Sequence, residues 1–493
     1  MPAAVLWFRR DLRLADNPAL QAILDAGHVP VPVYIHNESD PDWPLGEASA
    51  WWLHHSLLAL KESLQQCGSD LLVFRGNPAA ILAKLLQQSR ADTLAWNRCH
   101  EPAQVTRDDR ILQSFTQQGY HVSCHNAALL REPGEVLKKD GTPYRVFTPF
   151  WKALHTLGPA RQAIPATDSL PTFDAGSLTD SLSVTELGLL PAVKWYQAFP
   201  MYWCPGEAGA RDALHGFCED RLIDYPTARD IPGVSGTSRL AAHLHFGEIS
   251  PVQIWHHLMQ RAAGNSSAGI ITATESYLRE IAWREFSHHL LHRFPHTVLQ
   301  PLDPRFAGFP WRTGYQDLLE QWQQGRTGIP IVDAGMRELW STGTMHNRVR
   351  MIVASFLTKN LLIPWQEGAR WFWNTLVDAD LANNTLGWQW VAGSGADAAP
   401  YFRIFNPVLQ GEKFDRGGHY VRRWVPELAG LGDKYIHRPW AADPAVLADA
   451  GIRLGNEYPQ PLVDLQTSRK AALAAWDQVK RQQGQPPAYL QRR

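Results

Sequence analysis

The chain has 493 residues, of which 45% are hydrophobic and 19% charged, a composition typical of globular proteins with a sizeable core. Its formal net charge of -1, from 47 basic and 48 acidic residues, argues against indiscriminate binding to nucleic acid, although it permits a local basic groove. The five cysteines lack the spacing of a zinc site, and no apolar run is long enough to cross a membrane. We therefore expect a cytoplasmic protein without a metal site, and a monomer by default.

Short apolar runs alternate with helical stretches in the first part of the chain. Strand character is found at Ala4–Phe8, Val31–Ile35, Leu71–Phe74, Thr93–Trp96 and His121–Ser123. Predicted helices at Ala48–Gln66, Pro78–Gln88 and Pro102–Gln118 separate most of these runs. Strands alternating with helices predict βαβ units and a parallel sheet. No GxGxxG motif is present, so a dinucleotide fingerprint is absent.

Several charged residues follow the first predicted strand, at the end of a parallel sheet where ligands usually bind. They are Arg9, Arg10, Asp11 and Arg13, with Asn17 close behind. Two interpretations are open: a structural network of ion pairs, which we favour, or direct contacts with a ligand.

Regular patterning fades from residue 131 to residue 200, where proline, glycine, serine and aspartate are frequent. This composition predicts a long linker between domains. Its segment Tyr144–Leu154 is apolar enough to be docked on a domain. Helical patterning dominates afterwards, so we predict an α/β domain at 1–130, a linker at 131–200 and an all-α domain at 201–493.

The second half contains predicted helices and polar connections. The helices are expected at Gly206–Arg221, Thr272–Arg293, Met345–Leu362 and Thr467–Gln482, and a polar loop is expected at Tyr225–Val234. The hydroxyl-rich turn Ser235–Leu240 enters a further helix. Such a turn suits either a bound phosphate or a simple helix N-cap.

Two of these helices carry polar and aromatic residues on one face. Glu280, Trp283 and Arg284 lie at i, i+3 and i+4, and so do Asn347, Arg350 and Met351, with Arg348 beside them. The first set is either part of a binding site or an ion pair capped by tryptophan. In the second set, Arg350 either belongs to a binding site or forms a buried structural pair with Asp378, which the spacing alone favours.

The stretch Asp378–Pro407 is unusually dense in acids, amides and large aromatic side chains. Neither helical nor strand periodicity runs through it. Its glycines Gly387, Gly393 and Gly395 mark positions where the backbone bends or approaches a ligand closely. The composition suits a polar, planar ring as ligand, or an aromatic core loop.

Six motifs together identify a family resemblance. They are WFRRDLRLADNPAL near the N-terminus, then GTSRL, YLREIAWREF, GIPIVDAGMREL, MHNRVRMIVASFL and DADLANNTLGWQW. The residues of these motifs and their order along the chain resemble those of the photolyase/cryptochrome family, over nearly the whole chain. The resemblance implies FAD as cofactor and an antenna chromophore, methenyltetrahydrofolate rather than a deazaflavin.

The resemblance also implies roles for particular residues. The flavin contacts would be Tyr225, Thr237, Ser238, Arg239, Leu240, Arg284, Arg350, Asp378, Asp380 and Asn384, the last facing flavin N5. Contacts with the DNA lesion would come from Arg229, Glu280, Trp283, Asn347, Arg348, Met351 and Trp390. Trp388, Trp365 and Trp311 would relay electrons to the flavin, although without the resemblance they would be core aromatics. Glu101 would hold the folate, or it is a solvated helix-cap acid.

The function implied by the resemblance is light-driven repair of cyclobutane pyrimidine dimers in UV-damaged DNA. Excited, reduced FAD would donate one electron to a lesion flipped out of the duplex. One alternative is a cryptochrome, a blue-light photoreceptor. A (6-4) photolyase is a weaker alternative, because this chain has His346-Asn347 where those enzymes have two histidines.

Overall fold

The structure, a computed structural model, describes residues 1–37, 42–173, 180–264, 267–398 and 400–481. They divide into two compact units, which are described one at a time. Unit 1 comprises Met1–Pro226, Thr237–Pro295 and Val377–Asp380, and unit 2 comprises Thr227–Gly236, His296–Leu376 and Leu381–Arg493. The domain boundaries at residues 130 and 200 stay a prediction.

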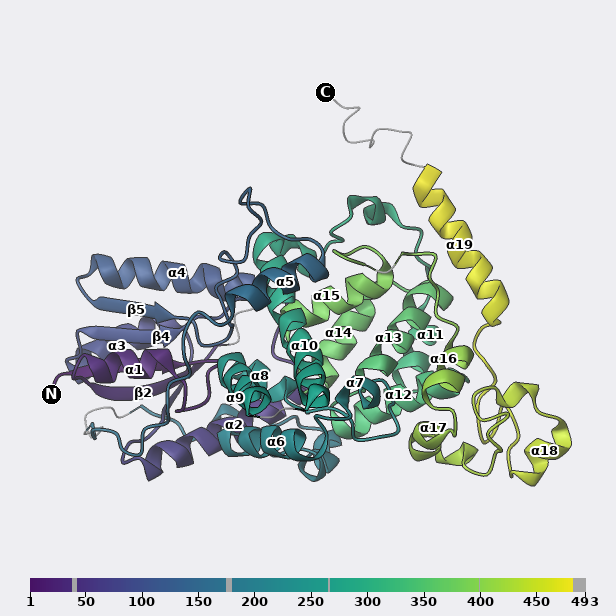
Figure 1. Cartoon of the computed structure of the whole chain (residues 1–493), viewed down its shortest axis with the longest axis horizontal. Coiled ribbons are helices and arrows are strands. Elements are labelled where there is room, and N and C mark those ends of the chain that lie inside the picture. The colour runs from purple at the N-terminus through teal and green to yellow at the C-terminus, as the bar shows by residue number, and fades with distance from the viewer. Residues whose placement is uncertain (38–41, 174–179, 265–266, 399, 482–493) are drawn as a thin grey trace. The chain divides into compact units, whose positions relative to one another are not determined.

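Unit 1 is built on a parallel sheet of five strands in the order β3-β2-β1-β4-β5 (Figure 1). The strands are β1 (Ala3–Phe8), β2 (Val29–His36), β3 (Leu72–Arg75), β4 (Thr93–Asn97) and β5 (His121–His125). The predicted α/β architecture is therefore confirmed, with each expected strand present.

Strand β2 contains two prolines although it lies between two other strands. Proline has no N–H to donate to a neighbouring strand, so it is tolerated only where one side of a strand is unpaired. The pairing of β2 with β3 begins at Val33, opposite Leu72. Pro30 and Pro32 both precede that position, in the part of β2 that pairs with β1.

Helices cover both faces of the sheet. They are α1 (Pro18–Asp25), α2 (Glu47–Gln66), α3 (Pro78–Ser89) and α4 (Pro102–Gln117). Leu6 and Phe8 of β1 belong to one apolar cluster with residues of α1 and α2. The alternating Val5 and Trp7 belong to a second cluster with residues of α3 and α4. Because neighbouring side chains of a strand point to opposite faces, this division places the two helix pairs on opposite sides.

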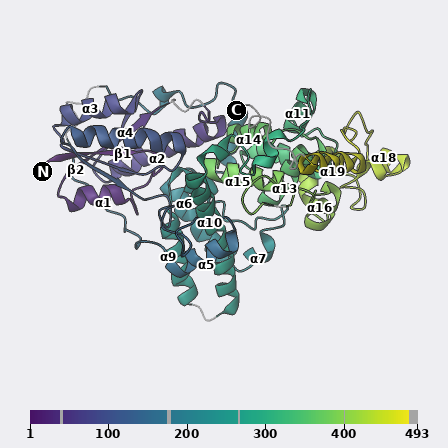
Figure 2. The same ribbon diagram turned by 90° about the horizontal axis from the view of Figure 1, so that it is seen from above.

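The rest of unit 1 is helical: α5 (Phe147–Leu157), α6 (Glu207–Asp220), α8 (Ala241–Phe246), α9 (Pro251–Ala263) and α10 (Ala268–Arg293). The long helix α10 packs against both α5 and α9 (Figure 2). Phe150 of α5 lies 5.1 Å from Phe286, ring centroid to ring centroid. The predicted docking of Tyr144–Leu154 is thus confirmed. Helix α10 begins at Ala268, four residues before the predicted Thr272.

The helices of unit 2 follow in chain order. They are α11 (Gln316–Gln323), α12 (Pro330–Thr342), α13 (Asn347–Ser355), α14 (Trp365–Thr375), α15 (Leu381–Ala392), α16 (Pro407–Phe414), α17 (His419–Trp424), α18 (Pro444–Asp449) and α19 (Leu465–Arg481). Helix α12 packs on α13 and α17, and α14 packs on α15. In the part of the chain that the structure describes, no helix is both long and apolar enough to span a membrane.

Three sequence predictions need correction. The loop Tyr225–Val234 begins with a short helix, α7 (Tyr225–Ala228). In place of one helix at Met345–Leu362, α13 begins at Asn347 and ends at Ser355, and a π-helical turn, Phe356–Asn360, follows it. The predicted end of the last helix, Gln482, lies outside the described residues.

The third correction concerns the stretch Asp378–Pro407, which contains helix α15 rather than irregular backbone only. Its apolar residues are spread around the helix, so they create no periodic stripe. Gly387 lies inside this helix without a bend, whereas Gly393 just beyond its end has the left-handed φ of 84°.

Candidate functional site

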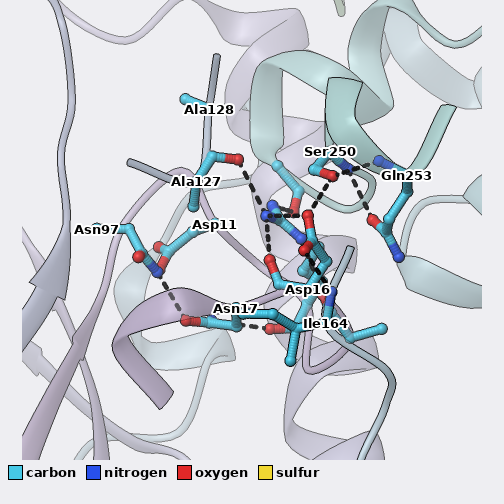
Figure 3. A network of polar contacts seen from close by, with 12 residues as sticks. Asp11, Asp16, Asn17, Asn97, Ala127, Ala128, Ile164, Ser250 and Gln253 are labelled. Carbon is cyan, nitrogen blue, oxygen red and sulfur yellow. Dashed lines mark hydrogen bonds and ion pairs between the residues drawn. The ribbon is translucent and has the colours of Figure 1, made fainter. Parts of the chain in front are cut away.

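A buried polar network fixes the loop after β1 (Figure 3). The Arg13 guanidinium donates to the carbonyl oxygens of Ala127 at 3.0 Å and Gly247 at 2.8 Å. Asp16 accepts hydrogen bonds from the Ile164 N–H at 2.9 Å and from the Ser250 hydroxyl. These contacts join four segments of unit 1, so Arg13 has the predicted structural role.

The neighbouring arginines lie beside the predicted antenna residue. Arg9 pairs with Asp108, and Arg10 pairs with Glu101. The Glu101 residue is only 7% exposed and its side chain makes no cap hydrogen bond to α4. A solvated helix-cap role for Glu101 is therefore wrong.

The predicted phosphate turn is held by a tyrosine of α10. The Tyr277 hydroxyl donates to Ser238 Oγ at 2.8 Å, and the Leu240 N–H donates to the same oxygen at 3.3 Å. Because the Ser238 oxygen already accepts two hydrogen bonds, its own hydroxyl proton is available to donate to an anion. Arg239 has a positive φ of 61°, so the turn is sharply bent at this position.

Three further predicted flavin contacts of unit 1 are Tyr225, which packs on Tyr277, and Thr237 and Arg239 of the turn itself. Tyr225 is buried, with its ring 5.2 Å from that of Tyr277. The carbonyl oxygen of Thr237 accepts from Arg221 at 3.2 Å. The Arg239 guanidinium lies 5.5 Å from the Trp203 ring centroid.

Asp380 is a buried carboxylate with two histidine neighbours. His245 Nδ1 lies 3.6 Å and His288 Nε2 lies 3.5 Å from its Oδ2. Burial opposes ionisation of Asp380, but His288, His245 and the charge of Arg284 outweigh it and hold its pKa well below the usual range. Burial also lowers the pKa of His245 to about 4. Unit 1 thus holds an anionic acceptor in its interior.

The three residues predicted to share a face of α10 differ in how exposed they are. Glu280 and Trp283 are partly exposed, whereas Arg284 is buried and donates to the Ala128 carbonyl oxygen at 2.6 Å. The Trp283 ring stacks on Phe147 of α5, with ring centroids 3.7 Å apart and planes inclined by 7°. The indole is thereby fixed from one side.

In unit 2, Arg348 lies at the centre of the predicted lesion contacts. Its guanidinium donates to Asp230 Oδ1 at 2.6 Å and to Met351 Sδ at 3.8 Å. It also covers the Phe414 ring at 4.5 Å from the centroid. These contacts hold Arg348 beside Met351.

The remaining predicted residues of unit 2 differ in exposure. Asn347 is exposed at the start of α13, and Arg229 and Trp390 are partly exposed. Arg350 donates to the Met345 carbonyl oxygen at 2.7 Å. Arg350 and Trp390 belong to unit 2, whereas the flavin contact Asp378 and the lesion contact Trp283 belong to unit 1, so their joint roles stay predictions.

The amide of Asn384 on α15 has a fixed orientation. Its Nδ2 donates to the Ala369 carbonyl oxygen of α14 at 3.0 Å. Because Nδ2 donates to Ala369, the orientation of the amide is set, and Oδ1 is the atom that can accept a hydrogen bond from a ligand.

The three predicted relay tryptophans all belong to unit 2. Trp388 is buried, packs edge-on against Phe372 at 5.0 Å and fills the space beside Gly368, where a Cβ atom would collide with it. Trp365 is also buried, and Trp311 is partly exposed beside Phe309, 4.3 Å away. Trp311 and Trp365 line the same cavity.

These groups fit a flavin dinucleotide by their chemistry. A diphosphate requires hydrogen-bond donors, and the Ser238 hydroxyl of unit 1 is one. An isoalloxazine ring requires acceptors for its N–H groups, and Asp380 in unit 1 and Asn384 Oδ1 in unit 2 are each of that kind. His245 Nδ1 is buried, and no hydrogen-bond partner is found for it among the described residues. Each unit therefore contains groups of a kind that could hold part of FAD.

Several supporting residues were not predicted from the sequence: Phe147, Asp230, His245, Tyr277 and His288. Tyr277 and His288 had a usable signal, because both lie on α10 at helical spacing from Arg284. Phe147, Asp230 and His245 belong to other segments.

Comparison with known proteins agrees with this arrangement. The family model described as "DNA photolyase" matches residues 4–168, and "FAD binding domain of DNA photolyase" matches residues 277–478. A deoxyribodipyrimidine photo-lyase of Agrobacterium fabrum is 46% identical over 97% of this chain and 98% of its own length. Cryptochrome-2 of Arabidopsis thaliana is 39% identical over 97% of this chain and 79% of its own length.

Solved structures give the same result. A bacterial class III photolyase from Agrobacterium tumefaciens superposes with a TM-score of 0.93, at 46% identity and 98% coverage of both chains. A cryptochrome from Synechocystis superposes with a TM-score of 0.87 at 29% identity, covering 96% of this chain and 99% of its own. The chain belongs to the photolyase/cryptochrome family, and it contains that family's FAD-binding domain.

Proposed function

We propose that this protein is a deoxyribodipyrimidine photolyase, which uses light to split cyclobutane pyrimidine dimers in DNA. The observation that carries the proposal is the 46% identity to a photo-lyase over 98% of that relative's length, joined to a TM-score of 0.93 with a class III photolyase. FAD, when bound in its reduced form, supplies the light-excited electron.

The lesion contacts of unit 1 are proposed to come from α10. Trp283 offers one face of its indole to the dimer, since Phe147 covers the other face at 3.7 Å. Because the Trp283 side chain is already held by this stack, it loses little conformational entropy when the lesion binds. Glu280, one turn earlier and partly exposed, accepts hydrogen bonds from the base edges.

The lesion contacts of unit 2 are proposed to come from α13 and its surroundings. Arg348 is oriented by Asp230 at 2.6 Å and lies beside Met351, so its charge faces a defined direction. Arg229, Asn347 and Trp390 complete this set. Because arginines neutralise phosphates, binding to DNA should weaken as salt is raised.

The cofactor would be held by the residues described above. The Ser238 hydroxyl donates to a phosphate oxygen, and Asp380 remains ionised to accept from a ring N–H. Ala369 holds the Asn384 amide with Oδ1 available at flavin N5. Trp388, Trp365 and Trp311 supply electrons from the protein surface when the flavin is oxidised.

We also propose a folate antenna, methenyltetrahydrofolate, held at Glu101. A buried carboxylate can accept hydrogen bonds from the amino group and ring N–H of a pterin, and Arg10 pairs with the Glu101 carboxylate. The protein is proposed to act as a cytoplasmic monomer.

A cryptochrome-type photoreceptor is the second candidate, favoured by the identity of 39% to Cryptochrome-2 and 36% to Cryptochrome-1 of Arabidopsis thaliana. A photoreceptor needs no selectivity for damaged DNA. Binding in the dark therefore separates the two candidates: a photolyase prefers oligothymidine containing one dimer to the undamaged strand.

The variant Glu280→Gln keeps the size of the side chain and removes its charge. We expect its affinity for the dimer to fall about tenfold, because a charge-assisted hydrogen bond is lost, with the flavin content unchanged. Glu275→Gln, an exposed position on the same helix, is the matched control and should bind normally. Equal binding of damaged and undamaged strands by the unmodified protein would count against the photolyase.

A further inference from the structure

Arg279 lies on α10 of unit 1, one helical turn before Trp283. Its guanidinium carbon is 5.6 Å from the ring centroid of Phe147 and 5.7 Å from that of Trp151, both on α5. Phe147 is also the ring that stacks on Trp283. Positions i and i+4 of a helix share a face, and here both side chains contact the same phenyl ring. The charge of Arg279 is therefore held next to the indole that is proposed to receive the lesion.

The Arg279 guanidinium has no anionic partner among the residues that the structure describes. No ion pair and no hydrogen bond of this side chain is found there, although the residue is half-buried. Other half-buried arginines of unit 1 pair with carboxylates, as Arg131 does with Glu135 and Arg161 with Asp16. A partly desolvated charge without a counter-ion is costly, and contacts with aromatic rings offset only part of that cost.

An acid at the right spacing on the same helix is left unused by Arg279. Glu275 precedes it by four positions, and an acid four residues before a basic residue is the favourable order for an ion pair on a helix. Glu275 is exposed, and no ion pair joins it to Arg279 in the described part of the chain. The guanidinium lies over the rings of α5 instead, so packing sets its position and its N–H donors have no acceptor oxygen there.

We propose that Arg279 binds a backbone phosphate of the damaged strand, at or beside the dimer that stacks on Trp283. A guanidinium presents its N–H donors in a planar fork that matches two oxygens of one phosphate. The inference rests on the proposed function, because only a flipped-out dimer brings its strand against Trp283. Arg279 thus determines specificity, since its contact adds affinity for the damaged strand and little for an undamaged one.

The variant Arg279→Met removes the charge and keeps an unbranched side chain over the rings. For oligothymidine with one dimer, we expect its Kd in the dark to rise about tenfold. The slope of log affinity against log salt should become shallower by about 0.7–0.9, the contribution of one phosphate. Arg279→Lys keeps the charge and should retain the slope. Arg110→Met, at an exposed position of α4, is the matched control and should bind like the unmodified protein.

The phosphate itself is identified with uncharged methylphosphonate, placed in turn before, within and after the dimer. At one of these positions the unmodified protein should lose affinity about tenfold, whereas Arg279→Met should lose no more than it has already lost. Flavin content equal to that of the unmodified protein shows that the variant is folded. Equal losses in both proteins at every position, or an unchanged salt slope in Arg279→Met, would overturn the inference.

The unmodified protein alone also tests the inference, because no loss at any of the three methylphosphonate positions would overturn it without a variant. Preference for the dimer over the undamaged strand separates this inference from the proposed function. A preference that Arg279→Met retains in full refutes the role of Arg279 only. A protein without any such preference refutes the proposed function, and the role of Arg279 with it.

Discussion

The indole ring of Trp283 lies flat on the phenyl ring of Phe147, with centroids 3.7 Å apart and an angle of 7° between the planes. Phe147 belongs to α5, in the segment that composition alone would assign to a linker. The stack fixes the ring that is proposed to receive the flipped-out lesion. A residue of the predicted linker therefore supports a residue of the proposed lesion site.

Replacing Phe147 with leucine should weaken lesion binding. Leucine retains an apolar side chain but removes the stack, and aromatic pairs contribute about 0.5–1.5 kcal/mol beyond burial, so affinity for a dimer should fall about twofold to tenfold. Fluorescence anisotropy with a dimer-containing oligonucleotide measures this. Phe309→Leu, in an aromatic cluster of unit 2, is the control; an equal loss there would mean that general destabilisation is responsible.

Gly368→Ala should impair the relay through Trp388. The added methyl group would overlap the Trp388 ring, so the ring must move or the helices must separate, at a cost of about 1–3 kcal/mol. Light-driven reduction of the flavin should slow, while repair by chemically reduced protein continues. Gly387→Ala on α15 meets no atom within 4 Å and should stabilise the helix by about 0.5–1 kcal/mol. Identical photoreduction in both variants would refute this role of Gly368.

Trp365→Phe should separate the relay from repair. Phenylalanine fills most of the space but is far harder to oxidise, so photoreduction of oxidised flavin should be lost. Repair by protein whose flavin was reduced beforehand should remain near normal. Loss of both activities in this variant would show that Trp365 serves the fold and not the relay.

Asn384→Asp tests the orientation of the amide. The new carboxylate would face the Ala369 carbonyl oxygen, which now accepts from Nδ2 at 3.0 Å. We expect a loss of about 1–3 kcal/mol in the free energy of unfolding, because a buried acceptor loses its donor. Urea unfolding measures the loss, with Asn383→Asp, at an exposed neighbouring position, as control. Unchanged stability would argue against the Asn384–Ala369 hydrogen bond.

Stability should fall with acid partly because of His346. Burial lowers its pKa to about 4, and its Nδ1 accepts from the Arg348 N–H at 3.2 Å, which requires a neutral ring. From about pH 6.5 down to about pH 4 the unfolded chain binds a proton that the folded chain does not, so the free energy of unfolding decreases as pH falls.

The variant His346→Asn keeps a cap for α13 and removes this titration. The drop in unfolding free energy between pH 7 and pH 5 should then be smaller by about 2 kcal/mol. His419→Asn, at an exposed position, should leave the drop unchanged. A variant with the full acid dependence of the unmodified protein would exclude His346 as its source.

The sequence allowed the parallel sheet to be predicted because buried strands and helices alternate with clear boundaries. Helix α15 was missed, since Asn383, Asn384 and Gly387 are poor helix formers and its apolar residues form no stripe. The π-helical turn after Ser355 was missed for a similar reason, because local propensity does not distinguish it from an α-helix.

The candidate site was predictable where its residues share one helix. Glu280, Trp283 and Arg284 are one turn apart, so their common face follows from spacing. The supports of that site come from elsewhere: Phe147 lies 136 positions before Trp283, and Asp230 lies 118 positions before Arg348. Such long-range pairs depend on tertiary packing and leave no periodic signal.

The most direct measurement of the central claim is the amount of cyclobutane dimer remaining in UV-irradiated oligothymidine after incubation with the flavin-reduced protein. The account predicts that dimers disappear under blue light, persist in darkness, and persist longer under light with Glu280→Gln. Dimers that persist under light with the unmodified protein, while illumination alters only its affinity for a partner protein, would contradict the account and favour a photoreceptor.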